Sequence, residues 1–374
     1  MDYETPQFFR VGQYAAAADR DVIDMVSGDP DWEPPPALLE GLRMYADGDP
    51  ASFQYPPSVG LEDLREEVAA RRGVDIDRLI ITNGAGEANH LATHGALEAG
   101  TGNSVLLTDP VYPYYAGRAN LLGADTRFVS VDETGHLDPA AVRQQIDDDT
   151  ALVVVNSPNN PLGVTYDPSA VQEIIDIAAA HDALVLSDEV YDHFDYSGRF
   201  ESALAADSDN VVVSNSFSKS LGITGWRVGY AVFPSEDAPE PWGELVAGAR
   251  TRHMLTNITG SRPAQAAVLH ALRQTGPDYY ATVRERLRDR VELFTDALER
   301  VGAEYTDPEG AFYVMARFPD TPGTFDAARR LIDEAGVAGM PGEAFGEARA
   351  EWFRFALVTS RVETAAARLE SYFE

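Results

Sequence analysis

Short apolar runs alternate with helical patterns through the middle of the chain. Six runs are rich in β-branched residues, end at turn-forming residues and have the length of buried strands. They occupy residues 78–82, 104–108, 151–155, 183–187, 210–214 and 228–233. Helical patterns lie between them, and the pattern at 168–182 opens on Asp167-Pro168, a favourable cap and first-turn pair. This alternation predicts an α/β fold with a mostly parallel sheet covered by helices on both faces.

The pattern changes after residue 244. The amphipathic stretch 278–302 predicts one long helix, and 310–318 has the pattern of a strand in a second domain, with helices near 325–335 and 362–373. We therefore predict an N-terminal arm and small-domain segment (1–45) and a large α/β domain (46–277). The linking helix and a small C-terminal domain would follow (278–374).

Charge and composition exclude several classes of function. The 61 acidic residues against 29 basic ones give a net charge of −32, which repels nucleic acid and anionic membranes. No apolar run is long enough to span a membrane and no signal-peptide pattern opens the chain, so we expect a cytoplasmic protein without nucleic-acid or membrane partners. The dispersed acidity indicates a surface adapted to high salt. The absence of cysteine excludes disulfides, thiolate catalysis and zinc–thiolate sites.

Polar and aromatic side chains follow five of the predicted strands. The segments are 83–87, 109–115, 156–163, 188–192 and 215–220. Ligands of open parallel sheets bind outside the carboxyl ends of the strands. We therefore expect these five segments to converge on one site.

Lys219 is the only lysine of the chain, and the other 28 basic residues are arginines. An amine can lose its proton when desolvated and then form a Schiff base with a carbonyl group, whereas a guanidinium cannot. This difference predicts that Lys219 is a reactive amine, against the alternative of a surface lysine without a role.

The same region offers groups that bind phosphate. Ser216 and Ser218 supply hydroxyls, and Arg227 lies eight residues beyond the lysine. The Gly84-x-Gly86 turn follows a strand and opens a helix whose N–H groups can hold an oxyanion. It is not a dinucleotide fingerprint, since the position required for a third glycine is asparagine. That spacing argues against a nicotinamide oxidoreductase.

Asp188 ends a predicted buried strand. A carboxylate there is costly unless a cation or hydrogen bonds compensate it. We expect either a capping role or a carboxylate kept ionised by a cation such as a protonated pyridine nitrogen.

Together these residues resemble the class I/II, fold-type I family of pyridoxal 5′-phosphate (PLP) aminotransferases. The most specific part is 214–230, which is similar to the family's Ser-x-Ser-Lys…Gly-x-Arg pattern. The resemblance implies a large PLP-binding domain and a smaller α+β domain formed by the C-terminal part and the N-terminal segment. It implies transfer of an amino group from an L-amino acid to a 2-oxo acid, through a Lys219 Schiff base and a ping-pong mechanism. It also implies a homodimer with shared active sites.

The resemblance assigns roles by position. Lys219, Asp188 and Tyr191 would be catalytic, with Asp188 on the pyridinium nitrogen and Tyr191 and Asn160 on the 3-oxygen. Tyr112 would stack on the ring. The remaining cofactor contacts would come from Ser216, Ser218, Arg227, Ala85 and Gly86, with Tyr55 reaching the phosphate from the other subunit. Arg354, Gly28 and Asn160 would bind the substrate.

The chain departs from the family pattern at a few positions. Ser157 and Leu162 replace an asparagine and a threonine of the usual motif around Asn160. Gly86 stands where some aspartate-specific relatives carry a lysine, and the absence of that lysine weakens the case for a dicarboxylic substrate without excluding it. A distal carboxylate could instead meet an arginine such as Arg10, Arg20 or Arg262.

Two rival functions remain. The same residues could serve a PLP-dependent β-eliminating lyase or decarboxylase, although a clamp on the α-carboxylate favours transamination. The other rival is a non-catalytic regulator joined to a DNA-binding domain, which the strong negative charge disfavours.

Overall fold

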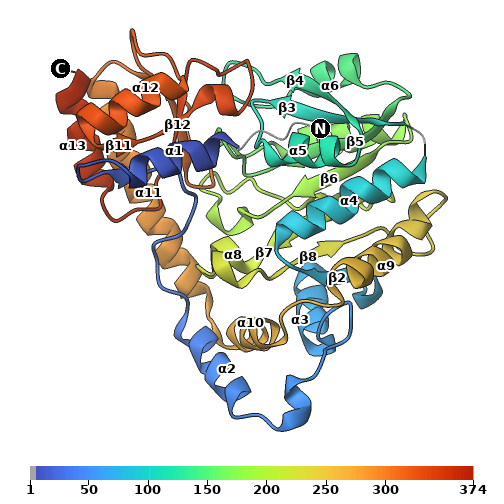
Figure 1. Cartoon of the computed structure of the whole chain (residues 1–374). Helices are drawn as coiled ribbons and strands as arrows, with labels where there is room; N and C mark the ends of the chain where they lie inside the picture. Colours follow the sequence, from blue (N-terminus) through green and yellow to red (C-terminus); the bar gives the residue numbers. More distant parts are fainter. Residues whose placement is uncertain (1–5, 101, 374) are drawn as a thin grey trace.

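A large, mostly parallel sheet forms the centre of the molecule (Figure 1). The computed structural model describes residues 6–100 and 102–373. The seven strands of this sheet lie in the order β2-β8-β7-β6-β5-β3-β4. They are Leu79–Thr82 (β2), Ser104–Asp109 (β3), Asp125–Ser130 (β4), Thr150–Asn156 (β5), Leu184–Asp188 (β6), Val211–Ser216 (β7) and Gly229–Val232 (β8). The pairs from β7 to β4 are parallel, whereas β8 runs antiparallel to β2 and β7. The predicted fold class is confirmed.

Strand β4 (Asp125–Ser130) was missing from the prediction. It lies at the edge of the sheet, and its residues are exposed or half-buried apart from Val129. An edge strand of this kind carries polar residues on its solvent side, so it has no continuous apolar run. The six predicted runs are all strands of the sheet, within one or two residues at their ends.

Helices cover both faces of the sheet. Alternate residues of β5 belong to different cores: Leu152 and Val154 face one side, and Val153 and Val155 face the other. Helices α4 (Ala85–Ala99), α5 (Tyr114–Leu121) and α9 (Leu245–Asn257) pack on the first side. Helices α3 (Glu62–Arg72), α7 (Pro168–Ala179) and α10 (Arg262–Gln274) pack on the second. Burial on both faces is the reason that the strands read as continuous apolar runs.

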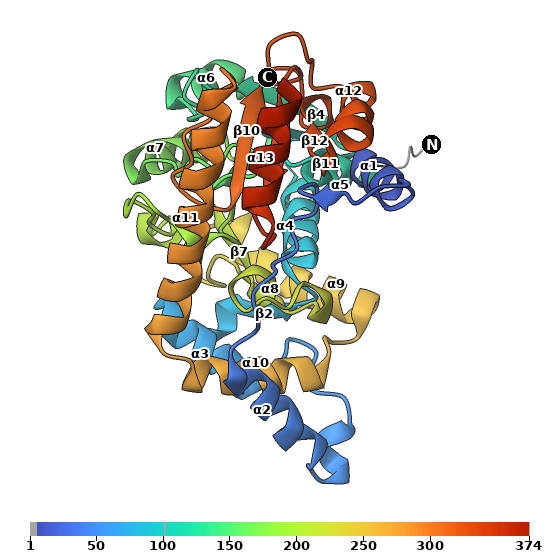
Figure 2. The same ribbon diagram turned by 90° about the vertical axis from the view of Figure 1, so that its left-hand side faces the viewer.

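A smaller antiparallel sheet lies beside the large one (Figures 1 and 2). Its order is β12-β13-β10-β9, formed by Met340–Pro341, Phe353–Ala356, Tyr313–Arg317 and Glu304–Tyr305. Helices α12 (Phe325–Arg330) and α13 (Val362–Phe373) complete this part, and the long α11 (Pro277–Arg300) packs on α13.

The N-terminal segment lies against this C-terminal part. Helix α1 (Gln7–Ala16) contacts α12, and β1 (Ile23–Asp24) pairs in parallel with β11 (Val337–Ala338). Helix α2 (Pro36–Ala46) packs instead on α10, and α6 (Pro139–Gln145) packs on α7. No helix within the described ranges has the length and apolarity needed to cross a membrane.

Candidate active site

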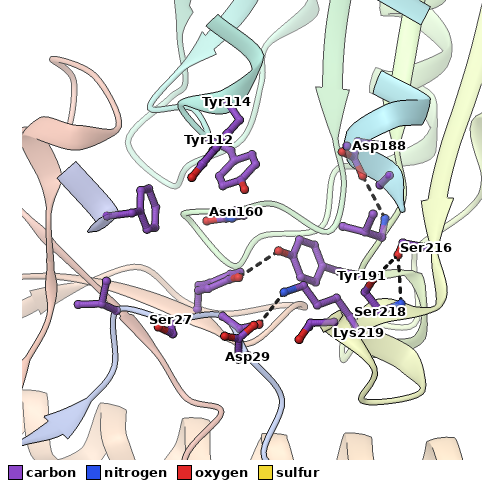
Figure 3. A pocket seen from close by; sticks show the side chains of 18 of the residues that line it. Ser27, Asp29, Tyr112, Tyr114, Asn160, Asp188, Tyr191, Ser216, Ser218 and Lys219 are labelled. Carbon is purple, nitrogen blue, oxygen red and sulfur yellow. Dashed lines mark hydrogen bonds between the residues drawn. The ribbon is translucent and has the colours of Figure 1, made fainter. Parts of the chain in front are cut away.

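A cavity of about 960 Å³ opens where the carboxyl ends of the parallel strands face the smaller sheet. All five segments that follow the predicted strands contribute to its lining, together with α1, β10 and β13. Figure 3 shows Lys219, Tyr191, Asn160 and Tyr112 around one common space, with Asp188, Ser216 and Ser218 to one side. The predicted site residues in the lining are Gly28, Ala85, Gly86, Tyr112, Asn160, Asp188, Tyr191, Ser216, Ser218, Lys219, Arg227 and Arg354.

Lys219 lies on α8 (Phe217–Ser220), a single turn that directly follows β7. Its Nζ donates a hydrogen bond of 2.6 Å to the carbonyl oxygen of Gly28. Burial lowers the pKa of this amine to about 8, partly opposed by the negative charge of Asp29. A substantial fraction of the amine is therefore neutral and nucleophilic at mildly alkaline pH.

Asp188 is the last residue of β6 and is 4% exposed. Its Oδ2 accepts hydrogen bonds of 2.7 Å from both Asn89 Nδ2 and the hydroxyl of Tyr115. Burial raises the pKa of this carboxyl, and the two hydrogen bonds oppose the rise. No cationic side chain among the described residues forms an ion pair with it. A buried carboxylate of this kind, in a cavity wall, fits a protonated ring nitrogen.

The N-terminus of α4 forms an anion-binding corner. Gly84 adopts a left-handed φ of 75°, and no side chain caps the helix that starts at Ala85. A Cβ at Gly84 would collide with the guanidinium of Arg227, so glycine is required there. The hydroxyl of Ser216 donates to that of Ser218 over 2.7 Å. Uncapped N–H groups, hydroxyls and a guanidinium together suit a phosphate.

Arg227 itself is held in an unusual backbone conformation, with φ of 58°. Non-glycine residues in the left-handed region carry strain, which often accompanies functional positions. Its Nη1 donates to the carbonyl oxygen of Thr224 over 2.7 Å, and its Nη2 donates to that of Asn83 over 3.3 Å. These bonds direct the guanidinium towards the start of α4.

Arg354 on β13 is 1% exposed and lies among aromatic rings. Its guanidinium carbon stands 4.5 Å from the ring centre of Tyr313 and 5.0 Å from those of Phe8 and Phe345. Nη1 donates to Asn160 Oδ1 over 3.1 Å, and Nη2 donates to the carbonyl oxygen of Val26. Its Nε is buried without a hydrogen-bond partner in the described residues. The guanidinium therefore keeps a donor for a carboxylate.

Tyrosine side chains complete the walls. The hydroxyls of Tyr191 and Tyr313 share a hydrogen bond of 3.0 Å, and burial raises the pKa of both phenols. Tyr112 stacks on Tyr114, with ring centres 4.9 Å apart. A side chain on Gly28 would collide with the Tyr313 hydroxyl, which explains glycine at that position.

Tyr55 and the three arginines suggested for a distal carboxylate do not line the cavity of this chain. Tyr55 is 77% exposed. Arg10 lies over the ring of Phe325, Arg20 donates to the carbonyl oxygen of Asp333, and Arg262 donates to those of Ala51 and Gln54.

Sequence reasoning missed several lining residues. Asn89 lies one helical turn beyond Ala85, so helical spacing alone could have placed it at the site. Tyr115 belongs to a cluster that the sequence did show, but nothing indicated its bond to Asp188. Tyr313 lies more than 90 residues from Lys219 in the sequence, and no local pattern points to it. Arg118 follows Tyr114 by one turn of α5 and also lines the cavity.

Three features occur together at the carboxyl edge of the parallel strands. They are a buried amine with a lowered pKa, a buried carboxylate without an ion-pair partner among the described residues, and a helix N-terminus suited to an anion. These features define an α/β enzyme whose site fits PLP, through an imine-forming amine, a partner for the ring nitrogen and a corner for the phosphate.

Comparisons with known proteins identify the family. The family model for class I and II aminotransferases matches residues 20–369. An aspartate aminotransferase of Pyrococcus horikoshii is 31% identical over 363 residues, which span 92% of this chain and 88% of that protein. A probable aspartate/prephenate aminotransferase of Thermus aquaticus is 32% identical over 88% of this chain and 86% of its own length. The solved structure of Thermus thermophilus aspartate aminotransferase with maleate matches with a TM-score of 0.88 and 28% identity, over 98% of this chain and 97% of that one.

The chain belongs to the class I and II aminotransferases and is a PLP-dependent transaminase. The predictions of family, fold, cofactor and activity are confirmed. The comparisons support transamination, and not the alternative of a lyase or decarboxylase.

Proposed function

We propose that this enzyme transfers the amino group of a dicarboxylic L-amino acid of the aspartate class to a 2-oxo acid. The observation that most supports the proposed catalysis is one cavity lined by both the buried amine of Lys219 and the buried carboxylate of Asp188. The names of the similar proteins support the choice of donor, since all three described above are called aspartate or aspartate/prephenate aminotransferases.

The proposed cofactor contacts follow the geometry. Lys219 would hold PLP covalently through Nζ, and Asp188 would hold its ring nitrogen. The phosphate would take the N–H groups of Ala85 and Gly86. The other contacts would come from Ser216, Ser218 and Arg227 on the phosphate, from Tyr191 and Asn160 on the 3-oxygen, and from Tyr112 on the ring face.

Each residue would have a defined chemical task. PLP, when bound, supplies an electron sink for the charge that develops at the substrate's Cα. Arg354 would grip the α-carboxylate as a fork, with Asn160 orienting the guanidinium and Gly28 leaving room for the substrate. When it is not bound to the cofactor, the neutral amine of Lys219 would take the proton from the substrate's Cα and hold it at Nζ. Asp188 would keep the ring nitrogen protonated.

A homodimer with shared sites is part of this proposal. Phe53 and Tyr55 are 52% and 77% exposed, and Leu255 and Ile258 are 77% and 54% exposed. The segment that contains Phe53 and Tyr55 adjoins the segment that contains Leu255 and Ile258, as shown by the hydrogen bond of 3.1 Å from the Thr259 hydroxyl to the carbonyl oxygen of Pro57. Exposed large apolar side chains on adjoining segments are typical of an interface. Sedimentation of wild type and Leu255→Asp tests it: we expect a dimer and a monomer respectively, and a monomeric active wild type would contradict it.

Two further properties remain predictions from the sequence. The acidic surface predicts greater stability in concentrated KCl, which denaturation at several salt concentrations measures; equal stability at low salt would contradict it. The cytoplasmic location is tested by fractionation of the native cells.

The function is tested by absorption spectroscopy of the purified protein with PLP. We expect a visible absorption band. Borohydride should reduce the imine and leave the cofactor covalently attached to the peptide containing Lys219. Aspartate should bleach the band and yield oxaloacetate, and a 2-oxo acid should restore it. A band that bleaches with alanine but not with aspartate would overturn the donor class alone. A protein that forms no band would overturn the role of Lys219.

A further inference from the structure

Four cationic side chains of this chain line the cavity: Lys219, Arg227, Arg354 and Arg118. The proposed function uses the first three, for the amine chemistry, the phosphate and the α-carboxylate. Arg118 has no task in it. The side chain is half-buried on α5, and its Nη1 donates to the carbonyl oxygen of Tyr114 over 3.2 Å.

Arg118 forms no ion pair with any carboxylate in the described ranges, although its positive charge partly opposes the rise in the pKa of Asp188. The neighbouring Arg127, also half-buried, is paired with both Asp147 and Asp149. In a chain with 61 acidic and 29 basic residues, carboxylates are plentiful as partners. A guanidinium that lines a cavity without an ion-pair partner is available to an anion that enters the cavity.

The guanidinium of Arg118 approaches the first turn of α4. A Cβ on Gly86 would lie 3.2 Å from Arg118 Nη2, which is the nearest contact that this Cβ would make. The glycine therefore leaves space into which the arginine reaches from the next helix. The charge that the sequence lacks at position 86 is supplied from α5, beside the helix N-terminus that also favours anions.

The substrate offers a third anion for this third guanidinium. The phosphate and the α-carboxylate have their own partners at Arg227 and Arg354. We propose that Arg118 is the specificity-determining residue that binds the distal carboxylate of a dicarboxylic substrate. A planar guanidinium can donate hydrogen bonds to both oxygens of that carboxylate at once. This inference rests on the proposed function and names the residue that selects its donor.

The test compares Arg118→Gln and Arg118→Lys with wild type and with Arg127→Gln. The last variant removes the same charge from another half-buried arginine, outside the cavity. Steady-state kinetics with aspartate and with alanine give kcat/KM for each donor. Calorimetric titration with maleate, a dicarboxylate without an amino group, measures binding apart from turnover. Titration of the PLP-free proteins with PLP measures cofactor affinity, and melting temperature reports folding.

We expect Arg118→Gln to lower kcat/KM for aspartate roughly 10- to 100-fold, the range for losing a hydrogen bond to a charged group. Maleate affinity should fall by a similar factor, while kcat/KM for alanine and PLP affinity stay within about twofold. Arg118→Lys should recover part of the loss because it restores the charge without the fork. Arg127→Gln should behave as wild type for both donors.

Other outcomes are decisive as well. Equal losses for both donors with weaker PLP binding would overturn the inference and make Arg118 a phosphate ligand. Equal losses with unchanged PLP affinity would assign it a structural role through Tyr114. Unchanged aspartate kinetics would also overturn it. A wild type that shows no preference for aspartate over alanine would instead overturn the proposed donor class, before any variant is compared.

Discussion

The lowered pKa of Lys219 has a consequence for stability that can be measured without catalysis. Burial lowers this pKa from its ordinary value of 10.5 to about 8. Each pKa unit corresponds to about 1.4 kcal/mol, so keeping the amine charged in the folded PLP-free protein costs about 3 kcal/mol. We predict that Lys219→Met, which removes the amine and keeps an apolar stem of similar length, stabilises the PLP-free protein at neutral pH.

The pH dependence gives the sign of this effect. Below pH 8 the amine is protonated in both the folded and the unfolded chain, so the whole cost is present. Between pH 8 and 10.5 the unfolded chain holds the extra proton, and wild-type stability rises with pH. Above pH 10.5 the amine is neutral in both states and the cost disappears. The advantage of Lys219→Met should therefore fall from about 3 kcal/mol at pH 7 to about 1 kcal/mol at pH 10, apart from a constant difference in packing.

Urea denaturation of the two PLP-free proteins between pH 7 and pH 10, at constant high salt, measures this difference. Arg143→Met is the control, because it removes a cation from an exposed ion pair with Glu173 whose charge does not change over this range. Its difference from wild type should be constant with pH. A Lys219→Met difference that is also constant with pH would refute the argument that burial holds the amine at a lowered pKa.

Three further predictions concern catalysis. Asp188→Asn should lower kcat roughly 10²- to 10³-fold, because a buried charged partner of the cofactor is lost, and it should leave the fold intact. Kinetics measure the first effect and melting temperature the second. A kcat near that of wild type would contradict the role of the carboxylate. Tyr115→Phe removes a hydrogen bond that opposes the rise in the pKa of Asp188, so this pKa should rise further. The acidic limb of the pH–kcat/KM profile should then move to higher pH. An acidic limb that does not move would contradict this role of Tyr115. Arg354→Lys keeps the charge but loses the fork, so kcat/KM should fall roughly 10- to 100-fold for aspartate and alanine alike; a loss confined to aspartate would place the distal carboxylate, and not the α-carboxylate, at Arg354.

The sequence predicted most of the large sheet, because a strand buried on both faces must be a continuous run of apolar residues. The sequence did not predict the edge strand β4, because most of its residues are exposed or half-buried and it has no continuous apolar run. The sequence also did not predict that β8 runs antiparallel to β2 and β7, because an apolar run has the same pattern in either direction. The proposed domain limits remain a prediction.

The sequence by itself determined which residues could carry the chemistry. Lys219 stands out because no other residue of the chain is a lysine, Asp188 because it ends a predicted buried strand, and Ser216 because it places a hydroxyl close to Lys219. These are local properties: a residue type and its position after an apolar run. Parallel strands bring their carboxyl ends to one edge, so the convergence of these residues also followed from the sequence.

Only the tertiary structure decided what surrounds them. The bond of Tyr115 to Asp188, the pairing of Tyr313 with Tyr191 and the approach of Arg118 to Gly86 join separate segments of the chain. No local pattern encodes such contacts, since they depend on how helices pack on the sheet and how the smaller sheet faces it. The same packing desolvates Lys219 and so lowers its pKa, which turns an unusual residue in the sequence into a reactive amine.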